Sequence, residues 1–294
     1  MKECKEELAL TDIYMARVRM KKRFRPTPCL TTCFGVDFGI DVLVKEENLS
    51  PTGSYFDRAV LNSLLVLPED QKRRGVITAS ECRPFIRALF YYGPKLGIPS
   101  CLYNIVFKDK FLIIVNPSTN ALIIIHFLSD HSLTMLAGLG TLGFEILEQC
   151  DCNLDAVIVP GSDANLLRAL RYSIKRIFPQ IKVMGVKVKE KESTRDSTDA
   201  LDNVPEISDV HISRTVLRVL EKKGFLLTTE GVSGMAAFLT GKVTQLRNGR
   251  VVVVFSESWL PSLLQLEQLI NEGLANGDRC LSVPTPVAGD VLIE

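Results

Sequence analysis

Three glycines, Gly138, Gly140 and Gly143, have the spacing of a loop that binds the phosphates of a dinucleotide. Such a loop directly follows a strand, opens a helix, and has an acidic partner at the end of the next strand. The preceding residues, SDHSLTMLA, do not have the pattern of a strand, and Asp155 comes before the next apolar run. We therefore interpret these glycines as a turn that lets a helix pack closely, and not as a nucleotide site.

Other reactive residue types form weaker combinations. The pairs Cys29/Cys33 and Cys150/Cys152 have no second ligand pair at zinc spacing, so no metal is expected. The three histidines form no recognisable constellation and no G-x-S-x-G motif occurs, so a Ser-His-Asp hydrolase is not indicated. The six basic residues from Arg17 to Arg25 have no matching basic face or aromatic interleaving elsewhere, which favours a solvated helix end.

The composition is that of a packed globular protein. Among 294 residues, 35 Lys and Arg nearly balance 34 Asp and Glu, with 46% hydrophobic and 23% charged residues. These values exclude a disordered chain, a collagen-like repeat and a polybasic nucleic-acid binder. The charged N-terminal segment MKECKEELAL and eight cysteines predict reduced thiols and a cytoplasmic protein. The apolar stretch 111–128 is interrupted by NPSTN, which leaves it too short for a bilayer, so neither a membrane nor a nucleic acid is expected as partner.

Strand-like and helix-like segments alternate, which predicts an α/β fold with a largely parallel sheet between layers of helices. Short runs rich in valine and isoleucine, such as RVVVVFS, suit strands that are buried on both faces. The polar, turn-rich segment 187–205 is expected to form a loop. The expected strands cover 41–46, 75–80, 98–107, 155–161, 182–188 and 250–256, and the expected helices 55–67, 84–96, 139–149, 164–178, 212–223 and 234–239.

A series of segments recurs in a characteristic order: TPCL, VLVKEENLSPTGSYFDRA, GVITAS, LAGLGTLGFEILEQ, NLDAVIVPG, KVMGV, TTEGVSGMAAFLTG and RVVVVFS. In this series the chain resembles the fold-type-II pyridoxal-phosphate family, and most closely the L-threonine/L-serine ammonia-lyases (dehydratases) and serine racemase. The resemblance covers most of the chain up to about residue 268.

The resemblance implies a two-lobed α/β fold of the tryptophan synthase beta type, with mostly parallel sheets flanked by helices. Residues 1–269 would form the enzyme-like domain, with a large lobe of residues 1–72 and 127–269 and a small lobe of residues 73–126. Residues 270–294 would be the remnant of a linker to a regulatory domain. Between residues 99 and 127 the chain is too short for the family's helical crossover, so a local antiparallel hairpin is expected there.

The resemblance also implies a cofactor site, and most of its residues are altered here. The Schiff-base lysine of the family falls two residues after Ser54, where this chain has Phe56. The loop that stacks on the cofactor ring reads SECR from residue 80, and the glycine-rich phosphate cradle reads GSDA from residue 161. The cofactor-binding positions implied are Ser54, Ser80, Arg83, Gly161, Ser162, Asp163, Ala164 and Ser256, the last of which would face the pyridine nitrogen.

These changes predict a catalytically inactive pseudoenzyme with no catalytic residues. A phenylalanine ring cannot form an imine, so Phe56 supplies neither the nucleophile nor its proton transfer. A carboxylate at Asp163, at about 4 Å from a phosphate and an effective dielectric of about 20, would cost about 4 kcal/mol. We therefore expect no cofactor and no metal, and a homodimer or a heteromer with an active paralogue. Two alternatives are an active lyase that uses pyridoxal 5'-phosphate on L-serine or L-threonine, and a decaying copy without function.

Overall fold

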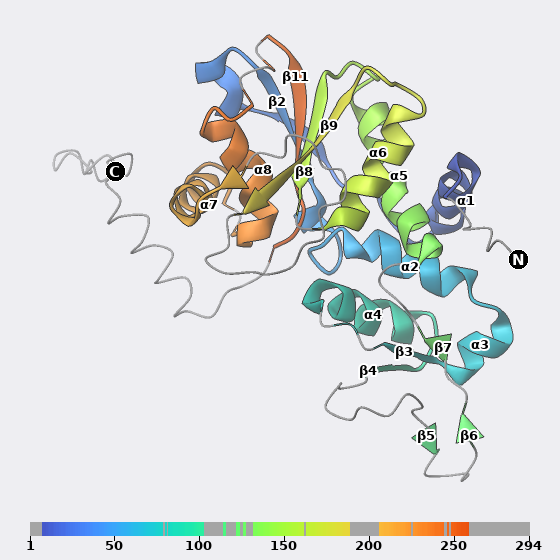
Figure 1. Cartoon of the computed structure of the whole chain (residues 1–294). Helices are drawn as coiled ribbons and strands as arrows, with labels where there is room; N and C mark the ends of the chain where they lie inside the picture. Colours follow the sequence, from blue (N-terminus) through green and yellow to red (C-terminus); the bar gives the residue numbers. More distant parts are fainter. Residues whose placement is uncertain are drawn as a thin grey trace, which may run out of the picture.

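A six-stranded sheet forms the centre of the larger part of the molecule (Figure 1). All neighbouring strands in it are parallel except β1, which pairs antiparallel to β2 with Cys29 opposite Lys45. The prediction of a mostly parallel sheet flanked by helices is confirmed. The strands lie in the order β1 (Cys29–Thr32), β2 (Asp41–Glu46), β11 (Arg250–Phe255), β8 (Ala156–Pro160), β9 (Lys182–Val188) and β10 (Glu206–Ile207). The computed structural model describes residues 8–78, 80, 82–102, 114–115, 122–123, 126–127, 132–161, 163–188, 206–224, 226–243, 246 and 248–258.

Helices cover both faces of this sheet. On one face lie α5 (Leu133–Gln149) and α6 (Ala164–Lys175), and on the other lie α7 (Asp209–Lys223) and α8 (Thr229–Leu239) (Figure 1). Val252 and Val254 of β11 belong to the hydrophobic core that includes α5 and α6, whereas Val251 and Val253 belong to the core that includes α7 and α8. Because side chains alternate across a strand, the unbroken apolar run of β11 supplies both cores.

A second, parallel sheet contains β4 (Ser100–Leu102), β3 (Val76–Thr78) and β7 (His126–Phe127). The helices α2 (Phe56–Val66), α3 (Glu69–Arg74) and α4 (Arg83–Lys95) lie between or beside the two sheets (Figure 1). The core that includes α5 continues through α2 into α4, so one apolar interior joins the two sheets.

Short strands β5 (Ile114–Val115) and β6 (Leu122–Ile123) pair antiparallel, which confirms the predicted hairpin. Phe127 lies in the smaller sheet, where it pairs with Ile77. The resemblance instead places residue 127 at the start of the second part of the large lobe. The division into lobes stays a prediction. The predicted tail 270–294 and nearly all of the loop 187–205 lie outside the described residues.

The glycines at 138, 140 and 143 do not form a turn, and this prediction is wrong. They lie inside α5, which begins at Leu133 and is capped by Ser132, whose Oγ accepts from the Met135 N–H at 3.3 Å. A Cβ on Gly138 would lie 2.5 Å from the Arg58 carbonyl oxygen, and one on Gly143 would lie 2.1 Å from Ser173 Oγ. The expected close packing is therefore present, because α5 meets α2 and α6 through these glycines.

The basic run starts in α1 (Leu10–Met20) and continues into the following turn. Arg17 forms an ion pair with Glu148 of α5 at 2.5 Å, and Lys21 and Lys22 are exposed. The expectation of a solvated helix end is confirmed. Within the described residues, no helix has the length and hydropathy needed to cross a membrane.

Candidate functional site

The segment between β2 and α2 lies against the end of β11. The Tyr55 N–H donates to the Ser256 carbonyl at 3.1 Å, and the Ser258 N–H donates to the Gly53 carbonyl at 2.9 Å. Gly53 has φ +74°, and a Cβ there would lie 2.8 Å from Ser258 Oγ, so this close approach requires glycine. These contacts bring the predicted site residues Ser54 and Ser256, both buried, to one place.

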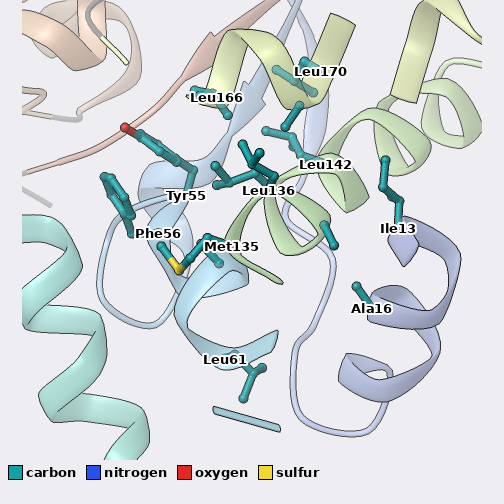
Figure 2. Packing of buried hydrophobic residues seen from close by; sticks show 14 of the residues in the cluster. Ile13, Ala16, Tyr55, Phe56, Leu61, Met135, Leu136, Leu142, Leu166 and Leu170 are labelled. Atoms are coloured by element: carbon teal, nitrogen blue, oxygen red, sulfur yellow. The ribbon is translucent and has the colours of Figure 1, made fainter. Parts of the chain in front are cut away.

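Phe56 is the first residue of α2, and only 7% of its surface is exposed. Its ring stacks on that of Tyr55 with centroids 4.5 Å apart, and it meets Phe85 of α4 edge to face at 6.1 Å. Figure 2 shows the side chains of Tyr55 and Phe56 next to each other at the start of α2. Phe56, where the resemblance predicts the Schiff-base lysine, is therefore part of the hydrophobic core.

Asp163 caps α6 with its own carboxylate. Its Oδ1 accepts from the N–H groups of Asn165 at 2.8 Å and Leu166 at 3.3 Å, and its Oδ2 accepts from the Tyr55 hydroxyl at 2.8 Å. Burial, followed by the charge of Asp163, raises the pKa of the Tyr55 phenol well above its usual value, so the phenol remains a donor. The N-terminal N–H groups that an anion would use are thus bound by a side chain of this chain.

The remaining glycine of the predicted phosphate cradle has a packing role. The Gly161 N–H donates to the Val186 carbonyl at 2.7 Å, and a Cβ would lie 2.8 Å from that oxygen. Ala164 is the exposed first residue of α6, and Ser162 lies outside the described residues.

The loop between β3 and α4 carries two further predicted site residues. Ser80 is partly buried, and its Oγ accepts from the Cys82 N–H at 3.1 Å. Arg83 is the exposed first residue of α4. Phe85, two residues further on, contacts Phe56, which brings this loop beside the start of α2.

Ser256 is the predicted residue that best fits the family's cofactor. It is 1% exposed, and its Oγ has no hydrogen-bond partner among the described residues, so it could bind a ring nitrogen. The following residue, Glu257, accepts from Thr228 Oγ1 at 3.1 Å, and burial raises the pKa of its carboxyl group.

The other positions fit such a cofactor poorly. Phe56 carries no amine, and the Asp163 carboxylate would lie close to a phosphate at the start of α6. The residues present therefore do not fit pyridoxal phosphate held through a lysine, as it is held in the family. Within the described residues, no group of three His, Cys, Asp or Glu side chains could hold a metal ion.

A buried cluster of charges beneath this site was not predicted. Arg58 donates to both carboxylate oxygens of Glu47 and to both of Glu145, at 2.8 Å each. Lys45 also contacts Glu145 and donates to Gln149 Oε1 at 2.7 Å. Burial would raise the pKa of Glu145, but Arg58 and Lys45 outweigh it and lower the pKa to about 2. The sequence signal for this cluster is Lys45, a charged residue within the apolar run VLVKEE.

The comparisons with known proteins agree with this fold. L-threonine ammonia-lyase of Thermotoga maritima is 23% identical in an alignment of 303 positions, gaps included, that covers 84% of this chain and 74% of that enzyme. The structure of maize serine racemase matches with a TM-score of 0.73 at 20% identity, over 90% of this chain and 98% of that one. A pyridoxal 5'-phosphate-dependent aspartate racemase matches with a TM-score of 0.72 at 19% identity, over 87% and 97% of the two chains. No family model matches the chain.

These relatives overturn one prediction. Pyridoxal phosphate is the expected cofactor in this family, so the prediction that none is to be expected is wrong. The covalent bond is one of several contributions to cofactor binding, and the buried Ser256 hydroxyl, which has no partner among the described residues, could still bind a ring nitrogen. In sequence and fold the chain is therefore similar to the threonine ammonia-lyases and serine racemases, and its fold is that of the fold-type-II pyridoxal-phosphate enzymes.

Proposed function

We propose that this chain is a threonine/serine ammonia-lyase-like protein that does not release ammonia from L-serine or L-threonine. The observation that carries the proposal is Phe56, at the position of the Schiff-base lysine and packed against Tyr55 and Phe85. In the family this lysine binds the cofactor as an imine and transfers the substrate's proton, and a phenylalanine ring can do neither.

The neighbouring groups offer no replacement for that amine. Lys45 is fully buried, and its ammonium group is bound by Glu145, Gln149 and the Thr27 carbonyl. The Tyr55 hydroxyl donates its hydrogen bond to Asp163 Oδ2. Neither the Lys45 amine nor the Tyr55 hydroxyl is therefore available for proton transfer from the substrate's Cα.

The direct test is release of ammonia from L-serine and L-threonine by the purified protein with pyridoxal phosphate added in excess. We expect no release above the rate of the cofactor alone. Deamination by the unmodified protein would overturn the proposal and favour the active lyase instead.

Restoring the lysine tests which changes matter. Phe56→Lys alone should remain inactive, because the Asp163 carboxylate still holds the N–H groups of α6. Its repulsion of a phosphate, at about 4 Å and an effective dielectric of about 20, is worth about 4 kcal/mol, or about a thousandfold in affinity. Asp163→Asn, added to Phe56→Lys, removes the charge and keeps a good helix cap, so it isolates this contribution. Joint repair also includes the loop residues Cys82, Arg83, Ser162 and Ala164.

The proposal extends to partners and location. A homodimer, or a heteromer with an active relative, is proposed by analogy with the fold, and co-purification with light scattering tests it. A strict monomer with no bound lyase would contradict that part. The cytoplasm is the proposed location, supported by the six described cysteines, all of which are free thiols.

A further inference from the structure

Two cysteines that are distant in sequence face each other across the larger sheet's edge. Cys29 Sγ and Cys150 Sγ lie 3.8 Å apart, although 121 positions separate the residues. Cys29 is the partly buried first residue of β1, and Cys150 is the buried residue that ends α5. A disulfide has sulfurs about 2.0 Å apart, so these two sulfurs would have to approach each other by about 1.8 Å to form one.

The polypeptide around both cysteines is held in place by adjacent contacts. The Thr27 carbonyl accepts from Gln149 Nε2 at 2.9 Å and from Lys45 Nζ at 2.7 Å. Gln149 immediately precedes Cys150, and Thr27 lies two residues before Cys29. The buried charge cluster therefore fixes the two segments against each other, and the thiols face one another as a result.

The local charges favour a thiolate in this pair. The hydrogen bond from Cys29 lowers the pKa of Cys150 more than burial raises it, and the charges of Arg250 and Lys45 lower it further. The same hydrogen bond raises the pKa of Cys29. Cys150 is therefore the member of the pair that loses its proton more readily, and its thiolate is the nucleophilic form.

We propose that Cys29 and Cys150 form a redox-reactive pair that a small peroxide converts into a disulfide between β1 and the end of α5. In the first step the Cys150 thiolate attacks hydrogen peroxide. An S–O bond forms at Cys150 and the O–O bond breaks, and the hydroxide that leaves takes the proton from the Cys29 thiol. The Cys29 thiolate then attacks the Cys150 sulfenic sulfur, so that the S–S bond forms and hydroxide leaves. Two thiols are oxidised and one peroxide is reduced to two waters once the hydroxide is protonated.

The test is peptide mapping of the full chain under non-reducing conditions after treatment with hydrogen peroxide. Trypsin leaves Cys29 and Cys33 in one peptide, residues 24–45, and Cys150 and Cys152 in another, residues 111–168. The Cys33→Ser/Cys152→Ser variant is therefore used as the parent, because a link between these two peptides can then join only Cys29 to Cys150. Both replaced residues are exposed, so this parent should fold.

We expect the linked peptide in the oxidised parent, its loss on addition of dithiothreitol, and its absence when Cys29→Ser or Cys150→Ser is added. The linked species should stay monomeric on a non-reducing gel. In the unmodified chain, fragmentation of the linked peptide should place the bond at the same two residues. Sulfinic acid at Cys150 without a link, two thiols that remain alkylatable, or a covalent dimer would each overturn the proposal.

Discussion

Replacing Glu145 with glutamine should strongly destabilise the fold, because it removes one of the two carboxylates of the buried charge cluster. Arg58 would keep only Glu47 as an anionic partner, and Lys45 would lose its carboxylate altogether. Arg58 and Lys45 are fully buried, so the variant would leave one uncompensated positive charge in the interior.

Two estimates of the unfolding free energy lost in Glu145→Gln agree. Breaking a buried ion pair by removing one partner costs about 3–5 kcal/mol. The pKa of Glu145, lowered from 4.5 to about 2, corresponds to about 3 kcal/mol of interaction that favours the charged form. Arg58 contributes more to this lowering than Lys45 does. Burial lowers the pKa of the Lys45 ammonium in spite of its carboxylate neighbours. We therefore expect Glu145→Gln to lose about 3 kcal/mol of unfolding free energy at neutral pH.

Urea unfolding with linear extrapolation measures this loss, and the same helix supplies a matched control. Glu148 lies one turn from Glu145, is more than half exposed, and pairs with Arg17 at 2.5 Å. Glu148→Gln should cost less than about 1 kcal/mol.

A rescue variant separates charge from packing. Lys45→Met/Glu145→Gln removes one charge of each sign and leaves the Arg58–Glu47 pair, so it should be more stable than Glu145→Gln alone. It also keeps the prediction testable if the single variant does not fold. A Glu145→Gln variant as stable as Glu148→Gln would refute the reasoning.

Three further outcomes follow from the same contacts. The folded pKa of Glu145 lies below its ordinary value, so the unfolded chain binds more protons than the folded chain between about pH 4.5 and 2. The stabilisation of the fold by ionised Glu145 is therefore complete above about pH 4.5 and disappears as the pH falls towards 2, and acid titrations of Glu145→Gln should lack this loss of stability. Gly161→Ala should destabilise by about 1–3 kcal/mol in urea unfolding, because its Cβ would meet the Val186 backbone at 2.8–2.9 Å; full stability would contradict that packing role. Phe56→Ala should cost about 3–5 kcal/mol, and a neutral result would mean that Phe56 is not part of the core.

The strands could be predicted well where burial on both faces dictates the residue types. The bounds of β2 and β9 match the prediction, because continuous apolar runs mark strands that supply two cores. In contrast, β1 was missed, since its sequence CLTT is short, lies at the sheet edge and mixes apolar with polar residues.

The start of α5 was missed for a different reason. Glycine is a weak helix former, so the sequence predicts a turn at Gly138 and Gly140 before the helix. Tertiary packing decides otherwise, because these positions lie against the Arg58 carbonyl and the Ile13 side chain, where a Cβ would clash. Local propensity carries no information about such contacts between distant segments.

The motifs predict where a candidate site lies, but the contacts of its residues could not be predicted from them. The sequence places an aspartate at residue 163, yet only the structure shows that its carboxylate caps α6 and binds the Tyr55 hydroxyl. The charge cluster was likewise missed, since Lys45 and Glu145 are 100 positions apart and meet only when α5 packs on β2.

The altered site residues depend on one another, and this bears on how the proposed loss of catalysis could be reversed. Phe56 stacks on Tyr55, the Tyr55 hydroxyl binds Asp163, and Asp163 binds the N–H groups of α6. A change at any one of these three residues leaves the other two in contacts that stabilise the present arrangement. The charge cluster beneath them holds α2, α5 and β2 together and does not depend on these contacts, so the fold can persist while the site above it changes. A replacement at Phe56, Tyr55 or Asp163 alone should therefore restore less activity than the same replacement does when all three positions are changed together, and activity assays of the single and triple variants measure this difference.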